Sequence, residues 1–143
     1  MLSQHFRARW IRSLIDTFYH IYSCKILHQD IKLSNILVDN GCLKVIDFAN
    51  GAIFPLDTDM EAIFANNHLA RVDILCLACV LYSIATWQIF RYDHFKKDRW
   101  PVPEELPPTS NDLCEDTIKT CWEDKYGTIA SLYEDMTDWL LEI

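Results

Sequence analysis

Helical periodicity dominates the first part of the chain. Apolar side chains recur three and four positions apart, at Ile11, Leu14, Ile15, Phe18 and Tyr22. This spacing places them on one face of an α-helix. Ser3 can accept a hydrogen bond from a free backbone N–H group of the first turn. The pattern therefore predicts a helix that begins after Ser3 and ends near Cys24.

Two short apolar runs follow at residues 36–38 and 42–46, and Asp39, Asn40 and Gly41 join them. An Asn-Gly pair readily adopts the positive φ angles that a two-residue hairpin turn requires. The runs are short and bounded by turn residues, as expected of strands. This segment is therefore predicted to be a β-hairpin.

The most apolar stretch covers residues 74–90, in which only Ser83, Thr86 and Gln88 are polar. A membrane span is one interpretation, but a bilayer needs about 18 to 20 apolar residues. This run falls just short and is interrupted. We therefore predict a helix buried on all sides in a globular core, opened by Asp73.

The remaining chain predicts loops and two closing helices. Residues 49–72 show no firm periodicity and are predicted to be a loop, and residues 91–110 hold all but one of the five prolines and predict an irregular connection. Helices are predicted at about residues 111–122 and 128–143. The second has an apolar stripe of Ile129, Leu132, Tyr133, Met136 and Leu140.

Length and charge limit the possible functions. The chain has 143 residues, of which 50% are hydrophobic, and a net charge of −8. This length fits one domain over residues 1–143 with a substantial core. Residues 102–143 hold eleven acidic but only two basic side chains. Such a surface repels polyanions, which argues against nucleic-acid binding.

Six cysteines are present, at positions 24, 42, 76, 79, 114 and 121. They lie in apolar or helical stretches without a preceding secretory signal, so we predict reduced, buried thiols in an intracellular and cytoplasmic protein. Cys76 and Cys79 form a C-x-x-C pair, which zinc and redox sites also use. No second ligand pair follows at zinc-finger spacing, so ordinary packing is predicted.

Residues 26–50 insert four polar side chains into an otherwise apolar segment: Asp30, Lys32, Asn35 and Asp47. The predicted hairpin returns Asp47 to the edge at which Asp30 and Asn35 lie. Two carboxylates and a carboxamide suit a hard cation such as Mg²⁺, and a lysine can hold a phosphate oxygen. Singly, such residues more often form turns or remain solvated. Their joint spacing favours a shared site.

The same segment resembles the catalytic lobe of the eukaryotic protein kinase family. The family's H-R-D-L-K-x-x-N loop appears as HQDIKLSN at residues 28–35, and its D-F-G as DFA at residues 47–49. The sequence DILCLA at residues 73–78 resembles the opening of its helix F, and Cys121-Trp122 matches a common C-W pair. The resemblance implies a protein-kinase-like C-terminal lobe, a mainly α fold with a small β-hairpin (α+β).

The resemblance also implies roles for the polar residues. Asp30 would orient the substrate hydroxyl or accept its proton, and Lys32 would steady the transferring phosphoryl group. Asn35 and Asp47 would bind Mg²⁺ that contacts the phosphates of ATP. A lysine two positions after the catalytic aspartate is typical of serine/threonine kinases.

Further roles concern the surroundings of the loop. Three residues would form the floor under the adenine of ATP: Ile36, Leu37 and Val38. Phe48 would pack on His28, and Asp73 would hold the backbone of the loop.

Several departures from the family accompany these matches. With only three glycines the chain has no glycine-rich strand, and no strand lysine or helix-C glutamate is recognisable, so we expect a truncated lobe without the family's small lobe. Gln29 replaces the arginine that receives activation-loop phosphate, and Ala49 replaces the glycine of D-F-G. The A-P-E glutamate and its arginine partner are both missing.

Two functions remain open. In one, the chain takes part in ATP- and Mg²⁺-dependent phosphoryl transfer to serine or threonine of a protein substrate, with a separate small lobe; the chain alone would be inactive or very weak. In the other, it is a pseudokinase-type binding module or degenerate fragment without catalysis. An apolar strip around residues 36–38 and the first helix predicts self-association or a protein partner.

Overall fold

The computed structural model describes residues 2–109 and 113–141. Its elements in chain order are α1 (Gln4–Ser23), β1 (Ile26–Leu27), η1 (Leu33–Asn35), β2 (Ile36–Asp39), β3 (Cys42–Val45), β4 (Ala52–Ile53), α2 (Met60–Asn66), α3 (His68–Thr86), α4 (His94–Lys97), η2 (Pro103–Glu105), α5 (Glu115–Trp122), α6 (Ile129–Asp135) and α7 (Thr137–Leu141). The predicted fold class, mainly helical with a small antiparallel hairpin, is confirmed.

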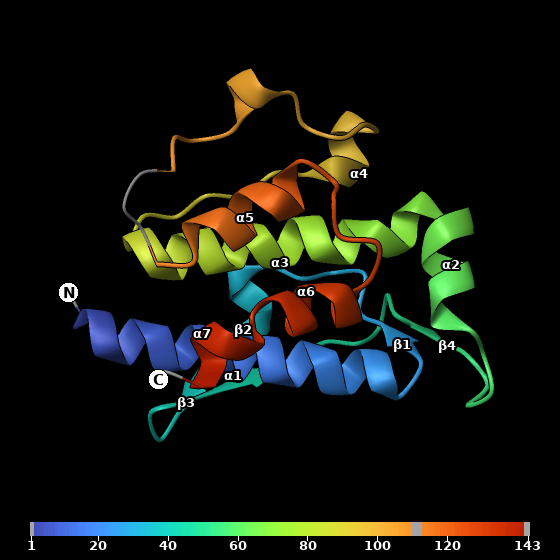
Figure 1. Cartoon of the computed structure of the whole chain (residues 1–143), viewed down its shortest axis with the longest axis horizontal. Coiled ribbons are helices and arrows are strands. Elements are labelled where there is room, and N and C mark those ends of the chain that lie inside the picture. Colours follow the sequence, from blue (N-terminus) through green and yellow to red (C-terminus); the bar gives the residue numbers. More distant parts are fainter. Residues whose placement is uncertain (1, 110–112, 142–143) are drawn as a thin grey trace.

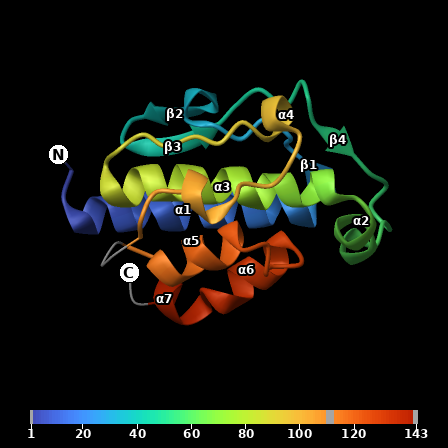
Figure 2. The ribbon, with the colours of Figure 1, turned by 90° about the horizontal axis from the view of Figure 1, so that it is seen from above.

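Two long helices, α1 and α3, form the centre of the molecule and lie side by side (Figure 1). The β2–β3 hairpin lies on one side of this pair, and α5, α6 and α7 lie on the other (Figure 2). Side chains from α1, α3, α5 and α6 join in one apolar core. The central pair thus forms the scaffold on which the hairpin and its preceding loop are mounted.

Helix α1 begins where the sequence predicts. The side-chain oxygen of Ser3 accepts a hydrogen bond from the backbone N–H of Phe6 at 3.2 Å, as an N-cap does. The predicted stripe faces the core: Ile11, Leu14, Ile15 and Phe18 are buried, and Tyr22 is half-buried. The helical prediction for the first part of the chain is therefore confirmed.

Helix α3 is the buried helix that the apolar run predicts. By length and composition it could cross a bilayer, but 78% of its most apolar 18-residue window is buried inside the fold. It begins at His68 and not at Asp73, because Asn67 accepts a hydrogen bond from the N–H of Leu69 at 3.1 Å and caps the helix one turn earlier. The prediction that Asp73 opens this helix is wrong.

The prediction of a loop over residues 49–72 is also wrong. This segment contains β4, which pairs with β1, and the short helix α2. The carboxylate of Asp59 caps α2 by accepting from the N–H of Glu61 at 3.0 Å. Only Met60 and Phe64 of α2 are buried. Two apolar anchors are too few for a periodic signal in the sequence.

The C-terminal helices are shorter than predicted. Helix α5 begins at Glu115, after Cys114 takes a left-handed φ of 49°; residues 111–112 of the predicted helix lie outside the described residues. The helix predicted over 128–143 breaks at Met136 into α6 and α7, and residues 142–143 are not described. The predicted irregular connection contains α4 and η2.

The hairpin forms as predicted, except that β3 ends at Val45 and not at residue 46. Asp39 pairs with Cys42, and the two turn residues Asn40 and Gly41 have φ angles of 53° and 79°. Both values are positive, as a type I′ turn requires.

All six cysteines are free, as predicted, but only Cys79 and Cys121 are buried, and Cys42 is exposed. Burial raises the pKa of the Cys79 thiol to about 11 and raises the pKa of Cys76 still further. Both members of the C-x-x-C pair are therefore protonated at neutral pH. Neutral thiols are poor metal ligands and poor nucleophiles, which supports the packing interpretation.

Candidate functional site

A buried carboxylate on α3 holds the loop at residues 28–35. Asp73 accepts hydrogen bonds from the backbone N–H groups of His28 at 2.8 Å and Gln29 at 2.9 Å, one on each oxygen. Gln29 has a φ of 66°, and its side-chain amide also donates to Asp73 at 3.1 Å and to the Leu69 carbonyl at 2.9 Å. These bonds fix an unfavourable backbone turn immediately before Asp30. The predicted role of Asp73 as a backbone clamp is confirmed by these contacts.

His28 links the loop to the strand that ends before Asp47. Its ring is fully buried, and its Nδ1 accepts from the N–H of Asp30 at 3.1 Å. Since Nδ1 is an acceptor, the neutral ring carries its hydrogen on Nε2, which donates to the Ile46 carbonyl at 2.9 Å. The ring of Phe48 lies edge-on to His28 at a centroid distance of 4.7 Å. The predicted packing of Phe48 on His28 is therefore confirmed.

Three of the four predicted polar residues are in direct contact. The amide nitrogen of Asn35, which is 6% exposed, donates to the backbone carbonyl of Asp30 at 2.8 Å and to its carboxylate at 3.1 Å. The ammonium of Lys32 lies 3.5 Å from the other carboxylate oxygen of Asp30. These two bonds orient the Asn35 side chain toward Asp30.

Asp47 lies on the second segment of the site. It has a φ of 62°, and its carboxylate accepts from the N–H of Ala49 at 3.3 Å. The N–H of Ile46 donates to the Asn35 carbonyl at 2.9 Å, so the residue before Asp47 is tied to the loop. A common metal site for Asp30, Asn35 and Asp47 remains a prediction.

Asn50 was not predicted to belong to the site. Its side-chain amide donates to the Asp30 carboxylate at 3.4 Å, three residues after Asp47. Gly51 makes this return possible: a Cβ there would lie 2.7 Å from the carbonyl oxygen of Leu27, which is closer than any side chain tolerates. The sequence shows a glycine at position 51, but only the fold shows that it lies against the backbone of Leu27.

The donor set can be compared with the needs of Mg²⁺. Within residues 2–109 and 113–141, no three histidine, cysteine, aspartate or glutamate side chains gather as a metal cluster. The candidate ligands are two carboxylates and an amide oxygen. Mg²⁺ is typically held by one or two carboxylates together with water and substrate phosphates. The residues present therefore fit a magnesium ion that enters with a nucleotide.

The three predicted adenine-floor residues divide between the two faces of β2. Ile36 and Val38 line an apolar groove of about 350 Å³ that Leu33 and Trp87 also border. Leu37, between them in the strand, points to the opposite face and is 48% exposed. A planar base can therefore rest on one face of the strand, and the adenine contact remains a prediction.

Comparison with known proteins agrees with this geometry. Residues 1–134 match the protein kinase domain family. The serine/threonine-protein kinase pim-2 of Danio rerio is 28% identical over 99% of the chain, and mitogen-activated protein kinase kinase kinase 3 of Arabidopsis thaliana is 29% identical over 73%. CBL-interacting protein kinase 25 of Oryza sativa subsp. japonica is 31% identical over 69%. The chain spans 50%, 20% and 18% of these three relatives, respectively.

Proposed function

The chain belongs to the protein kinase family, and from this premise we propose that residues 28–50 form the half of a phosphoryl-transfer site that binds Mg²⁺–ATP and the hydroxyl of a serine or threonine in a protein substrate. The main support for this proposal is that the side-chain amides of Asn35 and Asn50 both donate hydrogen bonds to the Asp30 carboxylate. Both amides fix the direction of the one carboxylate that must meet the incoming hydroxyl.

Each residue would act through a specific atom. The carboxylate of Asp30 would accept a hydrogen bond from the substrate hydroxyl. It would take the proton as the new oxygen–phosphorus bond forms and the bond from the γ-phosphorus to ADP breaks, so that ADP leaves. The ammonium of Lys32, 3.5 Å from Asp30, would contact a phosphate oxygen next to the attacking hydroxyl. Bound Mg²⁺, when present, neutralises charge on the phosphates. Asn35 and Asp47 would be its protein ligands.

The nucleobase would lie on one face of β2, where either Leu37 or the pair Ile36 and Val38 offers the apolar contact. Because a kinase site also requires groups that cover the phosphates from the other side, catalysis by these residues depends on a small lobe. Transfer by residues 1–143 alone is expected to be very slow. An intracellular, cytoplasmic location belongs to the same proposal and is supported by six free cysteines.

A binding module without turnover is the second candidate. The exposed apolar side chains on and near the hairpin favour it: Leu37 is 48%, Val38 58% and Phe48 44% exposed. Such a surface suits a protein partner as well as a nucleotide. Partner binding in the absence of nucleotide binding would then be the function of the chain.

Thermal unfolding with and without nucleotide tests the proposal. Mg²⁺–ATP should raise the Tm, and the shift should require both the metal and the nucleotide. Asp47→Ala should abolish it, whereas Asp57→Ala, the removal of a carboxylate from the loop before α2, should preserve it. A Tm that does not change with saturating Mg²⁺–ATP would reject the nucleotide site and favour the binding module.

A further inference from the structure

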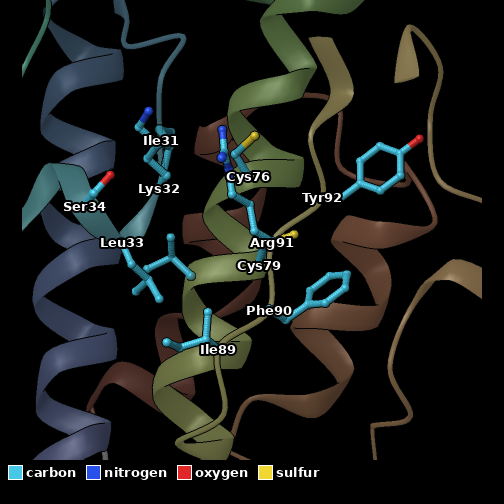
Figure 3. Close-up of a pocket in the computed structure, with 11 residues that line it drawn as sticks. Ile31, Lys32, Leu33, Ser34, Cys76, Cys79, Ile89, Phe90, Arg91 and Tyr92 are labelled. Carbon is cyan, nitrogen blue, oxygen red and sulfur yellow. The ribbon is translucent and has the colours of Figure 1, made fainter. Parts of the chain in front are cut away.

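A small pocket lies immediately beside the loop, between residues 31–34 and the segment at residues 89–92 that follows α3 (Figure 3). Its volume is about 150 Å³. Sites for drug-sized ligands usually measure about 300–1,000 Å³. The pocket therefore suits one side chain of a bound peptide and is too small for a nucleotide.

The charged residues that line this pocket are both cations. Lys32 contributes from the loop and Arg91 from the segment after α3, and among the described residues no carboxylate lines the pocket. This is unusual for a chain whose net charge is −8. Figure 3 shows Arg91 extending back along α3 toward Cys76. The two positive groups thus approach the same pocket from two different segments.

Two carboxylates contact these cations and also accept hydrogen bonds from other groups. Asp93 lies 3.9 Å from the Arg91 guanidinium, which is a weak contact, and it caps α4 by accepting from the N–H of Lys96 at 3.1 Å. Asp30 accepts hydrogen bonds from Asn35 and Asn50. Neither carboxylate lines the pocket. Lys32 also contacts the Asp30 carboxylate at 3.5 Å, so the more exposed Arg91 is the principal cation for an incoming anion.

The two sulfurs in the lining add no negative charge. Burial raises the pKa of the Cys76 thiol and raises the pKa of Cys79 to about 11. Both thiols therefore remain neutral at physiological pH. The pocket keeps the positive potential of Lys32 and Arg91.

The wall that presents Arg91 is held in place before any ligand binds. The hydroxyl of Ser83 on α3 accepts from the N–H of Phe90 at 2.9 Å and donates to the Cys79 carbonyl at 2.9 Å. The Phe90 ring packs edge-on against the Trp122 ring, with 5.7 Å between the ring centroids. Tyr92 is buried. Because both neighbours of Arg91 are anchored, little backbone ordering is needed on binding.

We propose that this pocket binds an anionic side chain of the protein substrate, next to the serine or threonine that is modified. The inference rests on the proposed function, since it places the anion beside Lys32 and Asp30. A carboxylate of aspartate or glutamate and a phosphoryl group on a neighbouring residue share the required chemistry. Arg91 would then determine which substrate sequences are accepted.

Peptide binding without nucleotide tests this inference. Three fluorescent peptides of equal length carry one serine flanked by glutamate, by phosphoserine or by glutamine. Their dissociation constants are measured by anisotropy with the wild type, with Arg91→Gln, and with Arg9→Gln as a matched loss of one exposed positive charge on α1. Arg91 is mostly exposed, so its replacement should preserve the fold, which circular dichroism checks.

The wild type should bind the glutamate peptide roughly 5-fold more tightly than the glutamine peptide, as expected for one partly exposed charge pair. Arg91→Gln should remove most of this preference, and Arg9→Gln should keep it. A tighter complex with the phosphoserine peptide would identify a previously phosphorylated substrate, and a tighter complex with glutamate an acidic one.

Equal affinity for the glutamate and glutamine peptides, no binding of either, or an unchanged preference in Arg91→Gln would overturn the inference. Failure of the pocket is separable from failure of the nucleotide site. A Mg²⁺–ATP thermal shift without peptide preference rejects only the anion pocket, and peptide preference without the thermal shift rejects only the nucleotide site.

Discussion

Asp73 combines two opposing physical effects in one side chain. It satisfies two backbone N–H groups of the loop, yet burial disfavours its ionised form and raises its pKa from 3.8 to about 6. The carboxylate is the acceptor that the structure shows for these two N–H groups. Its titration should therefore be visible in the stability of the whole fold.

Asp73→Asn keeps the size of the side chain but replaces one carboxylate oxygen with an NH₂ group. This group cannot accept the hydrogen bond of the backbone N–H that faces it. We expect a loss of about 1–3 kcal/mol in the free energy of unfolding at pH 7, because a buried N–H group is left without an acceptor. Urea unfolding measures this loss. Asp16→Asn, on the exposed face of α1, is the matched control and should change stability little.

The stability difference between the wild type and Asp73→Asn should depend on pH. The folded state binds the Asp73 proton more tightly than the unfolded chain does. The contribution of this proton to the free energy of unfolding is therefore complete below about pH 4 and is lost as the pH rises through about 6. The loss amounts to at most about 3 kcal/mol. Asp73→Asn lacks this change. The difference between wild type and variant should be larger at pH 4 than at pH 7, and a difference independent of pH would contradict the raised pKa.

Single residues of the site were predictable to different degrees. Asp30, Lys32 and Asn35 lie within six positions of one another, so local spacing alone predicted their contact, which the structure confirms. Asn50 and Arg91 were missed because their contacts depend on chain reversals at Gly51 and after α3. Local sequence patterns contain no signal for such approaches.

At the scale of elements, the hairpin turn depends on one glycine. Gly41 has a φ of 79°, and a Cβ there would meet no atom within 4 Å. Gly41→Ala should therefore cost about 1–2 kcal/mol through backbone strain alone. Gly127→Ala has equal space without a positive φ and should be neutral or slightly stabilising. Thermal unfolding of both variants distinguishes strain from packing, and equal effects would refute the strain argument.

A second element-scale feature is an ion pair between α3 and the residues that follow α5. The Arg71 guanidinium lies 3.1 Å from the Asp124 carboxylate. The contact is ionic, because Nε of Arg71 makes no well-directed hydrogen bond. Arg71 also donates to the Phe64 carbonyl at 2.9 Å. It thus joins α2, α3 and the end of α5.

A double-mutant cycle tests this pair. Arg71→Gln, Asp124→Asn and their combination should show a coupling energy of about 0.5–1.5 kcal/mol, since both side chains are largely shielded from water. The control pair Lys44 and Asp39 is shorter, at 2.8 Å, but more than half exposed. Its coupling should be smaller, and a larger value there would show that shielding does not decide the strength of these pairs.

The elements differed in how well the sequence predicted them. Helices α1 and α3 were found because each buries a long face, which leaves a strong periodic or apolar signal. Helix α2 and strand β4 were missed because each buries few side chains. The break at Met136 was missed because its own side chain is buried, so the apolar stripe continues across the interruption.

At the scale of the whole molecule, the apolar groove beside the hairpin is open to solvent. Its rim includes Val38, Trp87 and Ile89, which are 58%, 44% and 86% exposed. We propose that this surface is covered by a second copy of the chain when the chain is isolated. Sedimentation velocity should then show assembly that increases with concentration.

Charge at the groove should prevent this assembly. Val38→Lys should shift the equilibrium toward monomer, whereas Leu56→Lys, at an 81% exposed position before α2, should leave it unchanged. A wild type that remains monomeric over a hundredfold range of concentration would exclude self-association through this surface.

The central claim is that Asp30, Asn35 and Asp47 share one metal–nucleotide site, and paramagnetic NMR tests it most directly. With Mn²⁺ in place of Mg²⁺ and ADP as nucleotide, the amide signals of these three residues should broaden first, and Asp47→Ala should abolish the broadening. If the three signals remain sharp while those of the acidic C-terminal residues broaden, the metal binds elsewhere and the claim is contradicted.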